Sequence, residues 1–357
     1  MAYINGKEIL FSASISEYAG KQEQEKTAVV TESGQEILPD DGYVLSKVTV
    51  ELNVNTVKRF IELRDAIGLF YGCSTLNSET LFNAISYEET SSATSMENMF
   101  TGCTLLTSIP MLDSSNVTSM AYMFSNCRNL SSFPQLNTSK VVHMNNMFNL
   151  CVKLETIPMI DTSLVQSMNN MFYNCNALKS IPQLNTGNVT KIGNMFRGCN
   201  SLTSIPELNT VNVTLMDSLF YACTSLSTVT TLDMRSVTSA KDMFTDCSSL
   251  LDITLKNIKV NLTIGSGTSY GHLLSLNSLI GVIGELIDTG STKTLTIGTA
   301  NLEKIANVYV KLITITDEMR AADEFIDSKL PFEVCESTDD GAMLMKDYVT
   351  RKNWSLL

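Results

Sequence analysis

The cysteines of this chain are the first candidates for metal binding or disulfide formation, because of their number and spacing. Seven of the nine cysteines recur at one interval of 24 residues: Cys103, Cys127, Cys151, Cys175, Cys199, Cys223 and Cys247. Zinc sites usually pair two cysteines a few residues apart, whereas a constant interval of 24 would stack the thiols in one row. We therefore expect buried, reduced and unmetallated thiols, with Cys73 and Cys335 outside the row. The odd total fits free thiols made in a cytoplasm.

The chain contains two histidines, His143 and His272, and neither has a Ser, Cys or Asp at the spacing of a catalytic motif. Nucleophilic catalysis needs a nucleophile, a base and an orienting group within hydrogen-bond reach of one another. The sequence also contains no glycine-rich phosphate loop. We therefore expect no enzymatic activity, no cofactor and no bound metal.

The cysteines belong to a repeat, and this repeat predicts the elements that position every other side chain. A Phe stands three residues before each Cys, a Leu three residues after it, and a branched apolar residue or Phe six residues after it. The consensus is MFxxCxxLxxIPxL[ND]TxxVxxMxx. One unit has too few apolar residues to bury alone, so the units must stack, each touching only its neighbours. We expect about eight coils between residues 80 and 257, with these Phe side chains inward: Phe100, Phe124, Phe148, Phe172, Phe196, Phe220 and Phe244.

The two halves of the unit favour different secondary structure. The LxxIP segment is short and β-like, which predicts one strand per coil and a parallel sheet along the stack. Proline lacks an N–H, so we expect each strand to end at the proline of its coil: Pro110, Pro134, Pro158, Pro182 and Pro206. The VxxMxxMF segment has helix-like spacing and predicts a short helical turn on the opposite side. The predicted fold class is an α/β solenoid.

Short polar side chains also follow the period, after each strand: Asp113, Asn137, Asp161, Asn185, Asn209 and Asp233. Such side chains bond the backbone of a turn, so we interpret this series as structural rather than as metal or catalytic carboxylates. The same interpretation applies to Asn98, Asn146, Asn170 and Asn194.

The variable positions of the repeat are the candidates for function. The column two residues before each Cys contains Tyr173, Arg197 and Tyr221 in successive coils, where Thr, Ser or Asn stands elsewhere. Tyr and Arg are frequent anchors of binding surfaces, and we expect these three to stack into one exposed stripe. His143, at another variable position, completes the set of candidate ligand-binding residues. The alternative is that all four are scattered surface residues.

The segments around the repeat predict four regions. Residues 1–55 are expected to form a small β module, with strands near 27–30 and 47–52, and the apolar side chains of Val48, Val50 and Leu52 would seek a partner. Residues 56–98 combine an amphipathic helix, 57–71, with a degenerate coil in which Phe82, Ile85 and Met96 occupy consensus positions and Glu79 replaces the Cys. The solenoid covers 99–257. Residues 258–357 form an α+β cap with an insertion over 308–347.

The motif MFxxCxxLxxIPxLDTSxVTxM, as in residues 99–120, resembles the BspA-like leucine-rich repeats of bacterial surface proteins, in the variant found in mycoplasmas and in Firmicutes and their phages. The resemblance covers roughly residues 82–257 and implies a right-handed, curved solenoid used for adhesion or ligand binding. The flanks resemble phage tail and baseplate proteins, at one end through residues 39–50. The C-terminal flank shows the same resemblance through residues 272–305 and through the ending Lys352-Asn353-Trp354.

Charge and hydropathy limit the classes of partner that the chain is expected to bind. The net charge is −12, which argues against nucleic acid, because phosphate binding needs clustered Lys and Arg. Residues 91–250 contain 9 acidic and 8 basic side chains, so this nearly neutral part contrasts with acidic ends. The most apolar stretch, 273–287, is too short to span a membrane. The N-terminal residues do not have the pattern of a secretory signal.

Taken together, these features favour a structural and binding protein of a phage or phage-like particle, at the tail tip or baseplate and assembled in the bacterial cytoplasm. The N-terminal module would bind other tail or baseplate proteins, and the solenoid would bind a host-surface glycan or protein. Association between copies of the chain stays open. The alternative is a bacterial cell-surface adhesin with the same repeat.

Overall fold

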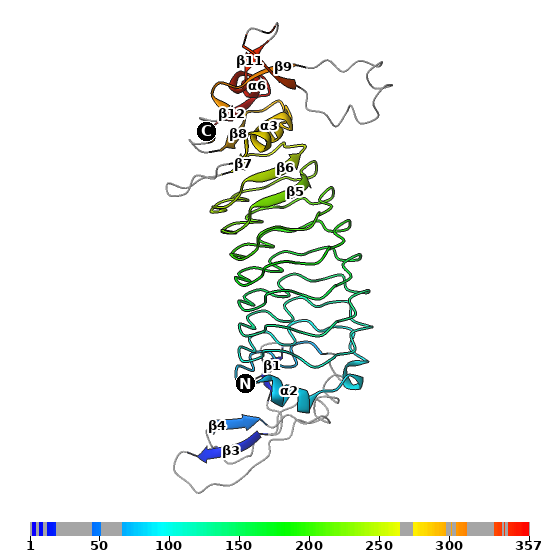
Figure 1. The fold of residues 1–357 in the computed structure, drawn as a ribbon. Coiled ribbons are helices and arrows are strands. Elements are labelled where there is room, and N and C mark those ends of the chain that lie inside the picture. Colours follow the sequence, from blue (N-terminus) through cyan, green and yellow to red (C-terminus); the bar gives the residue numbers. More distant parts are fainter. Residues whose placement is uncertain are drawn as a thin grey trace. The chain divides into compact units, whose positions relative to one another are not determined.

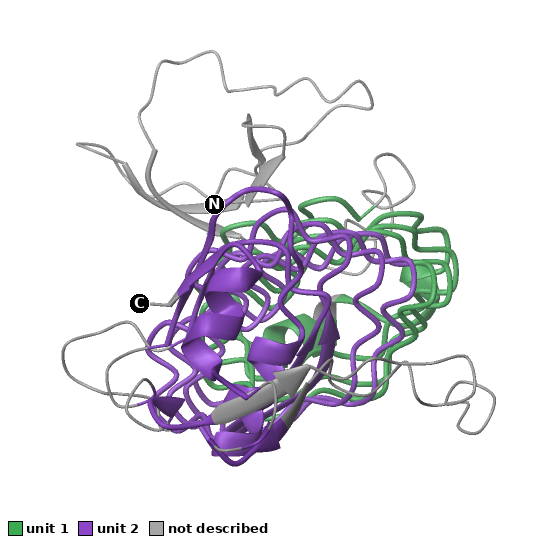
Figure 2. Cartoon of the chain, turned by 90° about the horizontal axis from the view of Figure 1, so that it is seen from above, with its two compact units in different colours: residues 1–164 green, residues 165–357 purple. Residues whose placement is uncertain are grey.

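The computed structural model describes the strands at 2–4, 7–9, 13–18 and 45–50, and then residues 66–264, 274–297, 301, 305–312, 332–337, 339 and 342–356. The chain divides into two compact units, Met1–Leu164 and Val165–Leu357 (Figure 2). In each unit the chain winds into coils that stack on one another (Figure 1). In the described residues no helix is long and apolar enough to cross a membrane.

The N-terminal strands form two antiparallel pairs. Strand β1 (Ala2–Ile4) pairs with β2 (Lys7–Ile9), and β3 (Ala13–Tyr18) pairs with β4 (Leu45–Val50). Strand β4 overlaps the strand predicted at 47–52. The strand predicted at 27–30 lies outside the described residues, as does most of the helix predicted at 57–71. The described end of that helix, residues 66–71, forms hydrogen-bonded turns instead.

The phenylalanines form the centre of the core, as the repeat predicts. All seven periodic Phe side chains are fully buried, together with Phe70. In unit 1 the rings of Phe70, Phe100 and Phe124 stack with centroids 5.4 and 5.7 Å apart. In unit 2 the rings of Phe172, Phe196, Phe220 and Phe244 stack at 5.7, 5.7 and 5.6 Å. Each ring thus packs against its counterpart one coil away, and the inward orientation is confirmed.

The segment predicted as a helical turn forms tight turns whose backbone hydrogen bonds run between coils. The N–H of Phe100 donates to the carbonyl of Met123 at 2.9 Å, and the N–H of Phe196 donates to that of Leu219 at 3.0 Å. Two left-handed residues in each turn prevent a helix, because right-handed helices require negative φ. One lies five residues before each Cys: Asn98, Tyr122, Asn146, Asn170, Asn194, Ser218 and Asp242. The other lies immediately before it: Gly102, Asn126, Leu150, Asn174, Gly198, Ala222 and Asp246.

The sheet predicted along the LxxIP segments forms strands in two coils. Strands β5 (Thr228–Asp233) and β6 (Asp252–Lys256) pair in parallel, with Val229 opposite Ile253. These two coils have Thr230 and Thr254 where the five preceding coils have proline. The five proline-bearing coils have no assigned strand in this segment, apart from a single bridge between Ser204 and Thr228. A proline in each coil removes one donor from the ladder, which accounts for the difference.

A second polar ladder lies inside the stack, beginning at Thr90 and continuing one residue after the members of the Asp/Asn series. Its members are at most 3% exposed: Thr90, Ser114, Thr138, Thr162, Thr186 and Thr210. The hydroxyl of Thr138 accepts the N–H of Asp161 at 2.7 Å. The hydroxyl of Thr210 accepts the N–H of Asp233 at 2.7 Å and donates to the Asp233 carbonyl at 3.0 Å. The ladder therefore satisfies backbone groups of the following coil that are hidden from water.

The first coil differs from the prediction in length and in its cysteine. Residues 66–73 adopt the turn of the later coils, with Gly68 and Gly72 left-handed, and the Sγ of Cys103 donates to the Phe70 carbonyl at 3.1 Å. Cys73 therefore continues the row, 30 residues before Cys103 rather than 24. Helix α2 (Ser78–Ala84) lies within the longer coil, and a 3-10 turn, η1 (Glu88–Thr90), follows. Phe82 does not take the buried consensus position that the 24-residue step predicts for it, since its side chain is 52% exposed and Leu81 is buried instead.

The C-terminal region is built from helices and strands, as the sequence predicts for a cap. Helix α3 (Leu276–Gly284) packs against β6, and the hydroxyl of Ser278 accepts the N–H of Ile253 at 3.1 Å. Strands β7 (Leu262–Thr263), β8 (Lys293–Thr296) and β12 (Trp354–Leu356) form a parallel sheet in the order β12-β8-β7. The Trp354 indole donates to the Ile287 carbonyl at 2.9 Å.

The insertion predicted over 308–347 contains a small antiparallel sheet. Strands β9 (Tyr309–Leu312), β10 (Phe332–Cys335) and β11 (Met343–Leu344) are arranged in the order β10-β9-β11, and helix α6 (Met345–Arg351) follows directly. Residues 313–331 lie outside the described part of the chain.

Candidate functional site

Tyr173, Arg197 and Tyr221 stand at equivalent points of three successive coils in unit 2. Each follows a left-handed residue by three positions, and its N–H closes the turn onto that residue's carbonyl, at 3.1, 3.1 and 3.2 Å respectively. The carbonyls of Arg197 and Tyr221 accept N–H groups of the preceding coil, from Asn174 at 2.7 Å and Gly198 at 2.8 Å. The backbone therefore holds the three side chains in register, one coil apart.

The three side chains form one stack, which we call the Tyr–Arg–Tyr ridge. The Cζ atom of Arg197 lies 4.1 Å from the ring centroid of Tyr221 and 5.8 Å from that of Tyr173. Both distances fall within the range of cation–π contacts. All three side chains are half-buried rather than fully exposed. The guanidinium lies closest to Tyr221 and occupies the ring face turned toward it, so a ligand cannot stack on that face.

His143 is not part of this ridge. It belongs to unit 1 and lies eight residues before Cys151, in a different column of the repeat, where it forms a β-bridge with Ser119. Its side chain is exposed, and its carbonyl accepts the N–H of Met120 at 3.0 Å. The structure therefore gives the candidate set two separate locations, one column for three residues and another for His143.

The Asp/Asn series caps turns, as predicted. The side-chain oxygen of each residue accepts the N–H two positions further along, at 2.9 Å for Asp161 and Asp233. Hydrogen bonds from Ser115, mainly from its backbone N–H, lower the pKa of Asp113. Hydrogen bonds from Ser163, again mainly from the backbone N–H, lower the pKa of Asp161. A lowered carboxyl pKa contributes stability above the pKa of the unfolded state, which is lost as the pH falls through the folded-state value.

The cysteine row is buried and hydrogen-bonded. All seven periodic Cys side chains have no exposed surface, and the thiols of Cys127 and Cys223 donate to the carbonyls of Phe100 and Phe196 in the preceding coil, at 3.0 and 2.9 Å. Burial raises the pKa of Cys127 and of Cys247 to about 12. In the described residues no group of three His, Cys, Asp or Glu side chains could hold a metal ion.

We expect the seven in-row thiols to resist alkylation in the folded protein at pH 8 and to react fully after unfolding. Thiolate is the reactive form, and burial suppresses both thiolate formation and access of the reagent. Cys335, which is partly exposed and lies outside the row, is the internal control and should react first, whereas burial raises the pKa of Cys73 at the end of the row. Mass spectrometry after alkylation with and without denaturant counts the modified thiols. Loss of two mass units per cysteine pair, or retained zinc, contradicts the expectation of free thiols.

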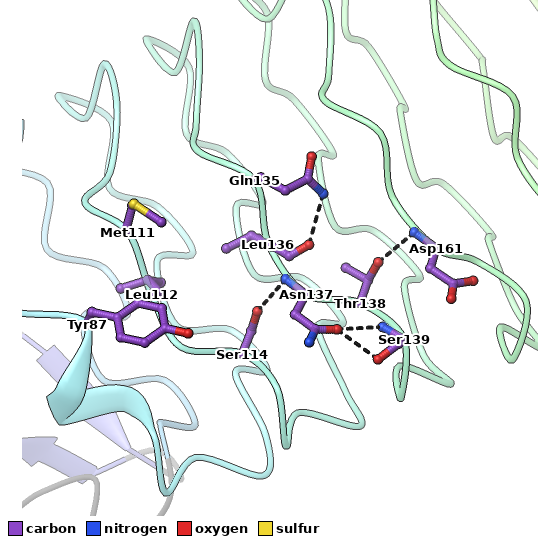
Figure 3. A pocket seen from close by; sticks show the side chains of 10 residues that line it. All are labelled: Tyr87, Met111, Leu112, Ser114, Gln135, Leu136, Asn137, Thr138, Ser139 and Asp161. Atoms are coloured by element: carbon purple, nitrogen blue, oxygen red, sulfur yellow. Dashed lines mark hydrogen bonds between the residues drawn. The ribbon is translucent and has the colours of Figure 1, made fainter.

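The structure also contains a cavity that sequence reasoning missed. It lies in unit 1, has a volume of about 440 Å³ and is lined by Tyr87, Met111, Leu112, Ser114, Gln135, Leu136, Asn137, Thr138, Ser139 and Asp161 (Figure 3). Tyr87 and Met111 expose 45% and 61% of their surface and give it an apolar side. Several lining polar atoms bond to the turns, as in the 2.8 Å bond from the Asn137 N–H to the Ser114 hydroxyl. Its signal in the sequence is the 24-residue step between Tyr87, Met111 and Gln135.

Comparisons with known proteins identify the repeat. A family model described as "Mycoplasma protein of unknown function, DUF285" matches residues 64–157 and 151–257, which together make up more than half of the chain. The crystal structure of a leucine-rich repeat protein from T. pallidum is 20% identical, with a TM-score of 0.31, over 52% of this chain and 72% of that chain. No curated protein sequence matches the chain.

Proposed function

The chain belongs to the Mycoplasma protein family DUF285, and on that premise we propose that it is a non-enzymatic binding protein that recognises a cell surface. The repeat would be a right-handed leucine-rich-repeat solenoid acting as a scaffold, and the Tyr–Arg–Tyr ridge would bind a host-surface glycan or protein. The observation that carries this proposal is the ridge itself, in which three large side chains replace the small polar residues of the other coils. Tyr and Arg are enriched among the residues that contribute most to binding energy at interfaces.

We assign the protein to a phage or phage-like particle, at the tail tip or baseplate. The support is the resemblance of both flanks to phage tail and baseplate proteins. The N-terminal module would bind other particle proteins, through an apolar strand face of the kind predicted from Val48 and Val50. Assembly of the particle would take place in the bacterial cytoplasm.

The second candidate is a bacterial cell-surface adhesin with the same ridge. The family match favours it, because that family is described from Mycoplasma, a cellular organism. Both candidates share the recognition function. They differ in whether the protein is attached to a phage-like particle or to a bacterial cell surface. Tail genes on either side of its gene, or gold-labelled antibody on tail tips in electron micrographs, support the particle. Labelling of intact bacterial surfaces supports the adhesin.

Deleting residues 1–55 should abolish incorporation into particles while leaving a soluble chain that still binds host cells. The reason is that the module and the repeat are separate in the sequence and are assigned different partners. Particle incorporation is measured by immunoblotting of purified particles, and cell binding by sedimentation with host cells. Normal incorporation of the truncated chain refutes docking through the module. A soluble, folded chain that binds no host cell refutes recognition by the repeat.

A further inference from the structure

We propose that Arg197 anchors an anionic group, a carboxylate or a phosphodiester, on the ligand of the Tyr–Arg–Tyr ridge. This inference rests on the proposed recognition function and names the chemistry of the ligand. It starts from the position of Arg197 between Tyr173 and Tyr221, with its Cζ 5.8 and 4.1 Å from the two ring centroids.

The two tyrosines determine which part of the guanidinium a ligand can reach. The group is planar and carries its five N–H donors in the plane, in a fork that matches the two oxygens of a carboxylate or phosphate. Tyr221 lies close to the guanidinium and Tyr173 stands in the coil on the other side, so approach from the directions of these two rings is restricted. A ligand therefore reaches the donors of Arg197 from outside the stack.

The donors of Arg197 are not used by the protein itself. In the described part of the chain its guanidinium makes no hydrogen bond, and no carboxylate lies within salt-bridge distance of it. Asp217, an acidic side chain of the neighbouring coil, instead accepts the N–H of Lys241 at 2.8 Å and the hydroxyl of Ser239. The charge of Arg197 is therefore available to a ligand, and it is partly desolvated because the side chain is half-buried.

A neutral sugar fits this arrangement less well than an acidic one. Neutral sugars are typically held by aromatic faces, and here the guanidinium of Arg197 occupies one face of Tyr221 at 4.1 Å and lies over Tyr173 at 5.8 Å. A carboxylate or phosphate gains charge-assisted, bidentate hydrogen bonds that a hydroxyl group cannot form. The tyrosine hydroxyls on either side, which no described residue engages, add a donor at each flank of the anion.

The test uses the full-length chain with three soluble polymers: poly(glycerol phosphate), polygalacturonate and neutral dextran. We expect the wild-type protein to bind at least one acidic polymer, to lose affinity as salt rises, and not to bind dextran. Arg197→Gln should weaken acidic-polymer binding at least tenfold. Arg197→Lys should weaken it too, because lysine keeps the charge but lacks the planar fork. Binding to poly(glycerol phosphate) identifies the anion as a phosphodiester, and binding to polygalacturonate identifies it as a carboxylate.

Arg128→Gln is the matched control, since Arg128 is an exposed arginine of unit 1 whose Nε donates to Asn126 at 2.8 Å. It should leave binding unchanged, and all variants should keep the wild-type thermal midpoint. Equal acidic-polymer binding by Arg197→Gln, absence of binding to both acidic polymers, or equally tight dextran binding overturns the anion anchor. If host cell envelopes still bind Arg197→Gln and wild type equally, recognition stands and the anchor is wrong. If wild type binds no envelope, the proposed function itself fails.

Discussion

Replacing Phe196 with alanine should lower the free energy of unfolding by about 3–5 kcal/mol, the range seen when a buried aromatic ring is removed. Phe196 has no exposed surface and stacks on Phe172 and Phe220 at 5.7 Å on both sides. Its loss leaves a cavity between two rings that the backbone ladders hold one coil apart. Because each coil is stabilised by its neighbours, the defect should weaken the adjoining coils as well.

Unfolding in guanidinium chloride, followed by far-UV circular dichroism, measures this loss. Phe82→Ala is the control, because Phe82 is 52% exposed on helix α2 and its removal should change the free energy by less than about 1 kcal/mol. A loss below that value for Phe196→Ala contradicts the phenylalanine stack as the centre of the core.

Replacing Thr210 with valine should lower the free energy of unfolding by at least about 2 kcal/mol, although the two side chains have nearly the same shape. The Thr210 hydroxyl bonds both the N–H and the carbonyl of Asp233, at 2.7 and 3.0 Å, and is 1% exposed. Valine leaves both backbone groups buried without a partner, and each such group costs about 1–3 kcal/mol.

Thr214→Val is the matched control for the buried ladder. The Thr214 hydroxyl donates to the Thr190 carbonyl at 3.1 Å near the surface, where water can replace it. Its replacement should have less than half the effect of Thr210→Val in the same denaturation experiment. Equal effects at the two positions contradict the assignment of the buried threonines as internal caps.

Much of the core could be predicted because it depends on spacing alone. A constant 24-residue interval forces like residues to meet, so the burial of the phenylalanines and cysteines follows from the sequence. The turns were harder to predict, because left-handed backbone at Leu150 or Tyr122 is enforced by the neighbouring coils and not by the residue type. The role of Cys73 was hidden by the longer first coil around helix α2, which breaks the interval.

The candidate site could be predicted in part. The column of Tyr173, Arg197 and Tyr221 follows from the period, and the structure brings these three together. That their facing surfaces cover one another depends on side-chain conformation, which spacing does not determine. The cavity beside Tyr87 was missed for a related reason, since it is formed by residues of several coils that look ordinary one at a time.

The ridge is tested most directly as a recognition surface by removing its tyrosines from the full-length chain and measuring binding to host cell envelopes. Tyr173→Ser combined with Tyr221→Ser should fold normally, because Ser125 occupies the same column in unit 1. The control is Tyr122→Ser, which removes an exposed tyrosine at a turn position where Ser218 stands in a later coil. We predict that sedimentation with envelopes finds binding by the wild-type protein and the control, and at least tenfold weaker binding by the double variant. Unchanged binding by a folded double variant would contradict the ridge as the recognition surface.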